Sequence, residues 1–203
     1  MKLYYSVGAC SMAPHIVLHE LGLPFEAVQV DLGTHKLAKT GQDYYQINPK
    51  GYVPALEVDD GSLLTEVAAI LQYLADRKPE AGLLSAPGSM QRYRAIEWLT
   101  FISSELHKGF SPLWNPNMPE AAKQIALDRL QTRFALLDKH LASHEFLMGD
   151  RFTVADAYAY TILTWAAALK LDLGRWSHLK AYVQRIAARP AVRDTARNEK
   201  LAA

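Results

Sequence analysis

Cysteine is nearly absent from this chain, since Cys10 is the only one among 203 residues. One cysteine cannot form a disulfide within the chain, which excludes a disulfide-stabilised scaffold. An excess of charge is also lacking, because a net charge of +1 gives no electrostatic basis for binding nucleic acid or an anionic membrane. No uninterrupted apolar run approaches the ~20 residues of a membrane span, and no signal sequence opens the chain. We therefore expect a cytoplasmic protein.

The single cysteine lies in the segment Gly8-Ala9-Cys10-Ser11, between two predicted elements. A short strand at 3–5 precedes this segment, and a helix that Ser11 can cap follows it and ends at Gly22. A thiol at this junction lies beside the positive end of a helix dipole, which favours the reactive thiolate. The alternative is a small buried hydrophobic side chain, which is the usual role of a lone cysteine.

The first 80 residues or so alternate between strand and helix patterns, which predicts a mixed α/β layer. Asp59-Asp60-Gly61 predicts a tight turn between two strands, and Thr65 can cap the helix that follows them. The connection at 33–48 is polar and predicts only a short helical turn at 43–47. The other predicted elements are strands at 25–32, 53–58 and 62–64 and a helix with apolar positions Val67, Ile70, Leu71 and Leu74.

Proline and glycine cluster between Lys78 and Gly88, which indicates a linker. We expect one domain at 1–79, a linker at 80–87 and an all-α domain at 88–203. Thr153 and Asp156 have the spacing of a capping box at the start of a central helix. The helical stripes of the second domain are Ile96, Leu99, Ile102 and Leu106; Leu127, Leu130, Phe134, Leu137 and Leu141; and Leu179, Tyr182, Val183 and Ile186.

Several of these segments together resemble one family, the cytosolic glutathione transferases. The matching features are Tyr5, Cys10-Ser11, Val53-Pro54, Thr65-Glu66 and the capping box that ends at Asp156. The segments 8–11, 48–56 and 104–110 resemble the bacterial beta class in particular, and the resemblance covers essentially the whole chain. It implies a thioredoxin-like N-terminal domain, an all-helical C-terminal domain, and glutathione as the co-substrate.

The resemblance also implies where glutathione binds in the first domain. Val53-Pro54 resembles a cis-proline turn whose Val53 backbone pairs with the cysteinyl part of glutathione, beside Ala9 and Cys10. Without the resemblance, Pro54 would be an ordinary trans proline at the start of a strand. Glu66 and the amide of Val67 would take the γ-glutamyl ammonium and carboxylate, although Glu66 could simply complement the helix dipole. Relatives often have Ser or Gly in place of Val67, so a hydroxyl contact is absent here.

A basic residue in the polar connection should hold the glycyl carboxylate of glutathione. His35 and Lys36 both qualify, and the loop is one residue longer than in relatives, so the register stays open. We favour Lys36 because its charge is permanent at neutral pH. The alternative for an unaligned lysine in a loop is a solvated charge with no ligand.

In the second domain the resemblance implies that His107 faces Cys10 and stabilises a thiolate or relays a proton. Ser104, Glu105 and Lys108 would complete this polar wall. Thr100 would reach the site of the partner subunit in a symmetric homodimer. The expected hydrophobic substrate site consists of Phe110, Pro112, Leu113, Trp114, Tyr158 and Trp165, although several of these residues could be plain core.

Three functions are compatible with these residues. The first is conjugation of glutathione to small hydrophobic electrophiles, with possible thiol-disulfide exchange through Cys10. The second is glutathione-dependent reduction or removal of halide, and the third is a non-catalytic ligand-binding or partner-binding protein on the same fold. Tyr5 is expected to be a packed strand residue. We expect no metal, because His15 and His19 lack a third ligand at a suitable spacing.

Overall fold

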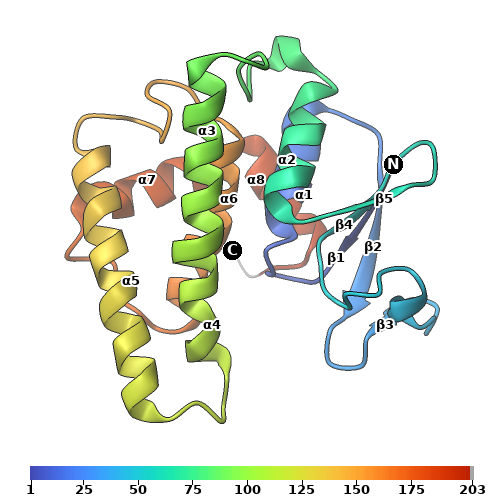
Figure 1. Ribbon diagram of the computed structural model, residues 1–203, viewed down its shortest axis with the longest axis horizontal. Helices are drawn as coiled ribbons and strands as arrows, with labels where there is room; N and C mark the ends of the chain where they lie inside the picture. Colours follow the sequence, from blue (N-terminus) through green and yellow to red (C-terminus); the bar gives the residue numbers. More distant parts are fainter. Residues whose placement is uncertain (202–203) are drawn as a thin grey trace. The chain divides into compact units, whose positions relative to one another are not determined.

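The structure is a computed structural model that describes residues 1–201 (Figure 1). The chain forms two compact units. The first unit comprises Met1–Gly82 and the C-terminal segment from Arg189 onward, and the second comprises Leu83–Ala188. The sequence-based division differs at this point, since it assigned everything after residue 88 to the second domain. The physical reason is that helix α8, Pro190–Asn198, packs on helix α1, Met12–Leu21.

A five-stranded mixed sheet forms the centre of the first unit, in the order β3-β2-β1-β4-β5. Strands β1 and β2 are parallel, and the other neighbouring pairs are antiparallel. The parallel pair is joined through α1, as a strand-helix-strand unit requires. The strands are β1 (Lys2–Tyr5), β2 (Glu26–Asp31), β3 (Lys36–Leu37), β4 (Ala55–Glu57) and β5 (Leu63–Thr65).

The two faces of this sheet are covered by different segments. Successive side chains of a strand point to opposite faces, so Leu3 and its partner Leu56 share one face while Tyr4 and Ala55 share the other. Helices α1 and α2 (Val67–Asp76) lie together beside the sheet (Figure 1). Tyr4 and Ala55 instead belong to a buried cluster with Tyr44, which lies in the short helix η1 (Tyr44–Gln46). A second short helix, η2 (Pro79–Ala81), follows α2.

The sequence patterns located most of these elements but missed some of their ends. Strand β3 lies inside the connection that was expected to be polar and without strands. Strand β4 begins after Pro54, which has no N–H to donate to a ladder. Thr65 ends β5, and Glu66 is the N-cap residue of α2, so the expected cap at Thr65 is wrong. Ser11 is the N-cap residue of α1, but its hydroxyl binds Ser6 instead of capping.

The second unit is entirely built of helices in its regular secondary structure, as expected. The interruption at 102–107 is a π-helical segment, η3, which the sequence did not predict. π-helical segments are rare and occur frequently at functional sites. Leu99, Leu106, Leu130 and Phe134 from the predicted stripes are buried. The helices are α3 (Met90–Phe101), η3 (Ile102–His107), α4 (Lys108–Trp114), α5 (Glu120–Leu141), α6 (Val154–Ala168) and α7 (Ser177–Ala187).

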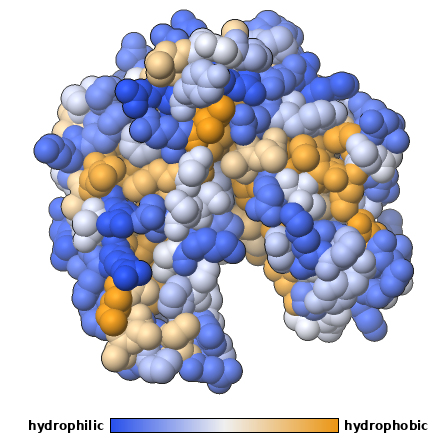
Figure 2. Space-filling model, in the orientation of Figure 1, coloured by the Kyte–Doolittle hydropathy of each residue, from blue (hydrophilic) through white to orange (hydrophobic). Residues whose placement is uncertain are grey.

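The face of the molecule seen in Figure 2 is mostly hydrophilic, with several apolar areas. The large apolar side chains exposed in the second unit include Met90, Tyr93 and Trp114. Single exposed apolar residues are normal in folded proteins. Within residues 1–201, no helix is both long enough and apolar enough to cross a membrane.

The predicted capping box is present at the start of α6, where it organises a buried polar cluster. The Asp156 carboxylate accepts hydrogen bonds from the backbone N–H groups of Leu147 and Thr153, each at 2.8 Å, and from the Tyr182 hydroxyl at 2.9 Å. Burial raises the pKa of Asp156, although these hydrogen bonds oppose the shift. Burial and the neighbouring carboxylate also raise the pKa of Tyr182. One side chain therefore joins the start of α6, the preceding loop and α7.

Replacing Asp156 should destabilise the protein strongly. In Asp156→Ala, four buried donors lose their acceptor: the N–H groups of Leu147 and Thr153 and the hydroxyls of Thr153 and Tyr182. Each unsatisfied donor costs about 1–3 kcal/mol. We expect a loss of at least ~3 kcal/mol in the free energy of unfolding, measured by urea denaturation. Asp172→Ala is the matched control, because Asp172 is exposed and caps only the Gly174 N–H. Equal stability of the two variants would contradict the role given to Asp156.

Candidate functional site

The thiol of Cys10 lies at the start of α1 and contacts the turn before β4. Its Sγ donates a hydrogen bond to the Val53 carbonyl oxygen at 3.2 Å, and the side chain is 8% exposed. The Val53–Pro54 peptide bond is cis, as the motif predicts. The backbone amides of Met12 and Ala13 bond to the carbonyls of Ala9 and Cys10. The thiol therefore lies next to the backbone that the motif assigns to the cysteinyl part of glutathione.

The start of α2 has the features of an anion-binding helix terminus. Glu66 precedes the first helical residue with φ of 72°, a left-handed conformation that is uncommon outside glycine, and it makes no side-chain cap. The first N–H groups of a helix have no partner within the helix and favour a negatively charged group. Lys50 Nζ lies 2.9 Å from the Thr65 hydroxyl and 3.1 Å from the Glu66 carboxylate. Both charges are exposed, so a ligand can reach them.

The structure distinguishes between the two basic residues of the polar connection. The His35 ring binds the Gly51 carbonyl through Nδ1 at 2.8 Å, which holds it against the turn that contains Val53. His35 also has a positive φ of 52°, and its ring packs on Tyr45 at 4.7 Å. Lys36 belongs to β3, where it pairs with Asp31 of β2. His35 is thus the residue tied to the Val53 turn.

Buried hydrogen bonds of Glu199 join the Cys10 segment to the C-terminal end of the chain. The Glu199 carboxylate accepts from the Gly8 N–H at 2.9 Å and lies 2.8 Å from Nδ1 of His15. The side chains of His15 and Glu199 are both fully buried. Nε2 of His15 is a buried nitrogen without a hydrogen-bond partner. Since Gly8 lies just before Cys10, the carboxylate fixes the loop that carries the thiol.

Tyr5 and His19 pack around the His15 ring. The Tyr5 ring lies 5.4 Å from His15, and burial together with Glu199 raises the pKa of the phenol. Tyr5 is a packed strand residue, as expected. His15 and His19 stack at 5.2 Å, and burial and the neighbouring His15 lower the pKa of His19. No group of three or more potential metal ligands occurs among the residues that the structure describes.

In the second unit His107 lies at the end of the π-helical segment, inside an aromatic cluster. Its Nδ1 is 2.7 Å from the Tyr158 hydroxyl, and its ring meets the Trp165 ring edge-on at 5.1 Å. Trp165 also makes edge contacts with Phe110 at 5.8 Å and Trp114 at 6.2 Å. Four of the six residues expected in the hydrophobic site therefore cluster around His107. Phe110 and Tyr158 are fully buried, whereas Trp114 is exposed.

The remaining expected residues of this unit make contacts of other kinds. Arg133 of α5 binds the Glu105 carboxylate through two nitrogens at 2.6 and 2.9 Å. Ser104 and Thr100 donate to backbone carbonyls of their own helix. The Lys108 side chain is exposed, and Pro112 and Leu113 are half-buried in α4. The ion pair between Glu105 and Arg133 joins the π-helical segment to α5.

Sequence reasoning overlooked Glu199, Lys50 and Gly8. Glu199 follows Gly8 by 191 positions, and no local pattern connects residues so far apart. Lys50 stands in the segment that carried the resemblance, but its side chain gave no sign that it reaches Glu66. For Gly8 the signal in the sequence was the glycine itself, at the start of the Cys10 segment. The structure gives it a φ of 66°, a conformation in which a side chain would be strained.

Comparison with known proteins agrees with this geometry. The family model of the glutathione S-transferase N-terminal domain matches residues 8–77, and that of the C-terminal domain matches residues 101–190. The chain is also 49% identical to the glutathione S-transferase GstA of Escherichia coli O157:H7, over 96% of each chain. The chain therefore belongs to the glutathione S-transferase family.

Two solved structures define the class more closely. One is a sphingomonad glutathione S-transferase complexed with glutathione, with 46% identity, full coverage of both chains and a TM-score of 0.95. The other is the bacterial beta class glutathione S-transferase of Sphingomonas chungbukensis, with 46% identity, full coverage of both chains and a TM-score of 0.96. These matches confirm the beta class that the motifs predict, and with it the two-part fold.

Removing the buried carboxylate of Glu199 should destabilise the first unit. Glu199→Ala removes the carboxylate that accepts from the Gly8 N–H and binds the His15 ring. Loss of an acceptor costs a buried polar group about 1–3 kcal/mol, and two such groups are affected here. We expect a loss of that order in the free energy of unfolding, measured by urea denaturation. Asp194→Ala removes an exposed pair with Arg197 in the same helix and should change stability by less than ~0.5 kcal/mol. Similar values for the two variants would refute the argument.

Proposed function

We propose that this protein binds glutathione and conjugates it, through its thiol sulfur, to small hydrophobic electrophiles. The observation that carries the proposal is the contact between the Cys10 thiol and the Val53 carbonyl at the cis-proline turn. Family membership over nearly the whole chain supports the same activity. The glutathione site would comprise Ala9, Cys10, the Val53–Pro54 backbone, Glu66 and the amide of Val67. Retention of each of these groups argues against a non-catalytic protein.

In this proposal the protein acts mainly on the thiol pKa of glutathione. A sulfur held near the start of α1 and close to hydrogen-bond donors is more acidic than a free thiol, so the thiolate is populated at neutral pH. The thiolate attacks an electrophilic carbon, forms a carbon–sulfur bond and expels the leaving group with its electron pair. The family resemblance assigns the handling of the proton to His107, whose Nδ1 lies 2.7 Å from the Tyr158 hydroxyl. Trp114, Trp165 and their neighbours would bind the apolar part of the electrophile.

Cys10 gives the same site a second reaction, thiol-disulfide exchange. The Cys10 thiolate attacks a disulfide of glutathione, forms a mixed disulfide and releases the other thiolate. A second glutathione then attacks the mixed disulfide, which yields oxidised glutathione and restores Cys10. This reaction requires Cys10 itself, whereas conjugation requires only glutathione bound beside it.

Cys10→Ala should separate the two reactions. Without its nucleophile, the protein should lose glutathione-dependent disulfide reduction by at least ~100-fold. Conjugation to 1-chloro-2,4-dinitrobenzene should fall by less than about tenfold, because helix α1 and the Val53 turn remain. Both rates are measured on the same preparation, and mass spectrometry checks the mixed disulfide. Loss of conjugation together with loss of glutathione binding would sink the proposed function.

We propose further that His35, rather than Lys36, holds the glycyl carboxylate. The support is the tie between His35 and the Gly51 carbonyl, which leaves Nε2 as the nitrogen available to a ligand. A ring carrying both protons can donate Nε2–H to a carboxylate. This reverses the preference drawn from permanent charge alone. Lys36 then remains an exposed lysine of a short edge strand.

Two variants test the choice between these residues. His35→Gln should raise the KM for glutathione about tenfold, the expected loss for a charge-assisted hydrogen bond, while Lys36→Gln should change it less than about twofold. The ethyl ester of the glycyl carboxylate is the ligand control, since its binding should not respond to His35→Gln. If Lys36→Gln raised the KM for glutathione more than His35→Gln does, and left binding of the ester unchanged, Lys36 would be the residue that holds the carboxylate.

We propose further that the protein forms a homodimer and that it is located in the cytoplasm. Met90, Tyr93 and Thr100 are exposed and lie on one face of α3, at spacings of three and seven residues. A partner subunit that packs on this face of α3 would cover the side chains of Met90 and Tyr93. It would also bring Thr100 toward the glutathione bound by the partner. The lone cysteine supports a reducing compartment.

A further inference from the structure

A cavity of about 890 Å³ lies in the first unit, away from the residues assigned to glutathione. Neither Cys10, Val53, His35 nor Glu66 lines it. The strand β2 provides four consecutive lining residues, Glu26–Gln29. Since successive residues of a strand point to opposite faces, a cavity lined by all four must run along the edge of the strand.

The backbone on this edge of β2 is open for part of its length. Strand β3 pairs with β2 only at Val30 and Asp31, and the next contact is the Ala38 N–H donating to the Gln29 carbonyl at 2.9 Å. Backbone groups that face one neighbour alternate along a strand, so Ala27 is the next residue whose N–H and C=O point to this side. Within residues 1–201, no strand pairs with Ala27 there. Ala27 is exposed.

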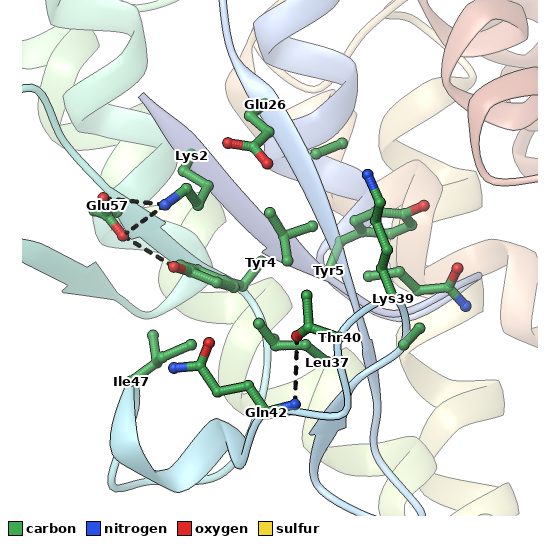
Figure 3. A pocket seen from close by; sticks show the side chains of 14 residues that line it. Lys2, Tyr4, Tyr5, Glu26, Leu37, Lys39, Thr40, Gln42, Ile47 and Glu57 are labelled. Carbon is green, nitrogen blue, oxygen red and sulfur yellow. Dashed lines mark hydrogen bonds and ion pairs between the residues drawn. The ribbon is translucent and has the colours of Figure 1, made fainter.

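The two faces flanking the edge differ in chemistry (Figure 3). On one face, Val28 lies beside Tyr4 and Ile47 in the margin of a buried apolar cluster. Tyr4 donates to Glu57 at 2.9 Å, and Lys2 lies 3.4 Å from the same carboxylate. Lys2, Tyr4 and Glu57 thus bind one another. The part of this face that a ligand could contact is the apolar surface around Val28.

The free charges at this edge belong to Lys39 and Glu26. Both side chains are exposed, and neither has an ion-pair partner within the described part of the chain. In Figure 3 the Lys39 side chain lies on the same side of β2 as Tyr5, and Glu26 lies beside Lys2 near the start of the strand. A molecule that binds along this edge would therefore need a negative charge on the face of Lys39 and a positive charge on the face of Glu26.

We propose that the β2 edge binds an extended peptide segment, which adds one strand antiparallel to β2 in line with β3. Such strand addition gains affinity from backbone hydrogen bonds and selectivity from alternate side chains. The peptide residue opposite Val28 would be apolar. The next, opposite Ala27, points to the other face and would be acidic, toward Lys39, and the third, opposite Glu26, would be basic. From its N-terminus to its C-terminus, the bound peptide would therefore carry an apolar, an acidic and a basic residue in succession.

The first test uses a blocked peptide, acetyl-Thr-Val-Glu-Lys-Thr-amide, titrated into the 15N-labelled full-length protein. We expect saturable shifts of the amide signals of Ala27–Gln29 and Ala38. The same peptide with an N-methyl group on its glutamate cannot donate to the Ala27 carbonyl, and it should bind at least about tenfold more weakly. No shift at these amides at millimolar peptide, or equal binding of the methylated peptide, would overturn the proposal.

Two protein variants complete the test. Ala27→Pro removes the outward N–H without touching the ladder to β1, since proline is tolerated at such an edge position. It should keep transferase activity and lose peptide binding about tenfold. Lys39→Glu should weaken this peptide and favour one with lysine in place of glutamate. If Ala27→Pro misfolds, the test rests on Lys39→Glu. The proposal is then wrong if that variant still prefers the peptide with glutamate to the peptide with lysine.

Discussion

The hydrogen bond from the Cys10 thiol to the Val53 carbonyl joins the two segments on which the proposed chemistry depends. One segment leaves β1 and starts α1, and the other is the turn that leads into β4. These strands are neighbours in the sheet, with Leu3 opposite Leu56. The sheet register therefore determines that the thiol and the turn meet, and the proposed site takes its geometry from paired strands.

Local sequence patterns predicted the elements that depend on local forces. Apolar periodicity located α2 and α5, because each buries one stripe of side chains. The Thr153–Asp156 capping box was visible because all its bonds lie within a few residues. The position of Cys10 at a strand-to-helix junction was predicted for the same reason. The resemblance to a family was needed for the roles of Val53, Glu66 and His107.

Features set by distant contacts could not be predicted in this way. The position of α8 depends on the pairing of Glu199 with His15 and Gly8, which are far apart in sequence. Strand β3 consists of two residues, too few to show an alternating pattern. The π-helical turn before His107 keeps the apolar positions of a regular helix, so its stripe gives no indication of the change. In each case the tertiary partner decides the local conformation.

The proposed choice of His35 over Lys36 rests on geometry rather than on charge. A lysine is always charged at neutral pH, but its flexible side chain must lose rotamer freedom when it binds a carboxylate. The His35 ring is already immobilised by the Gly51 carbonyl and by Tyr45. Preorganisation of this kind lowers the entropic cost of binding.

Val67 illustrates the opposite case, in which a departure from relatives has little consequence for the shape of the site. Its side chain is 5% exposed and belongs to the buried face of α2, so it does not fill the space above the helix terminus. The backbone amide of Val67 does not depend on the side chain and still points along the helix axis. What the valine removes is one hydroxyl donor. In the proposed site, selectivity for the γ-glutamyl end rests on Glu66 and on the backbone, and Lys50 Nζ lies 3.1 Å from the Glu66 carboxylate.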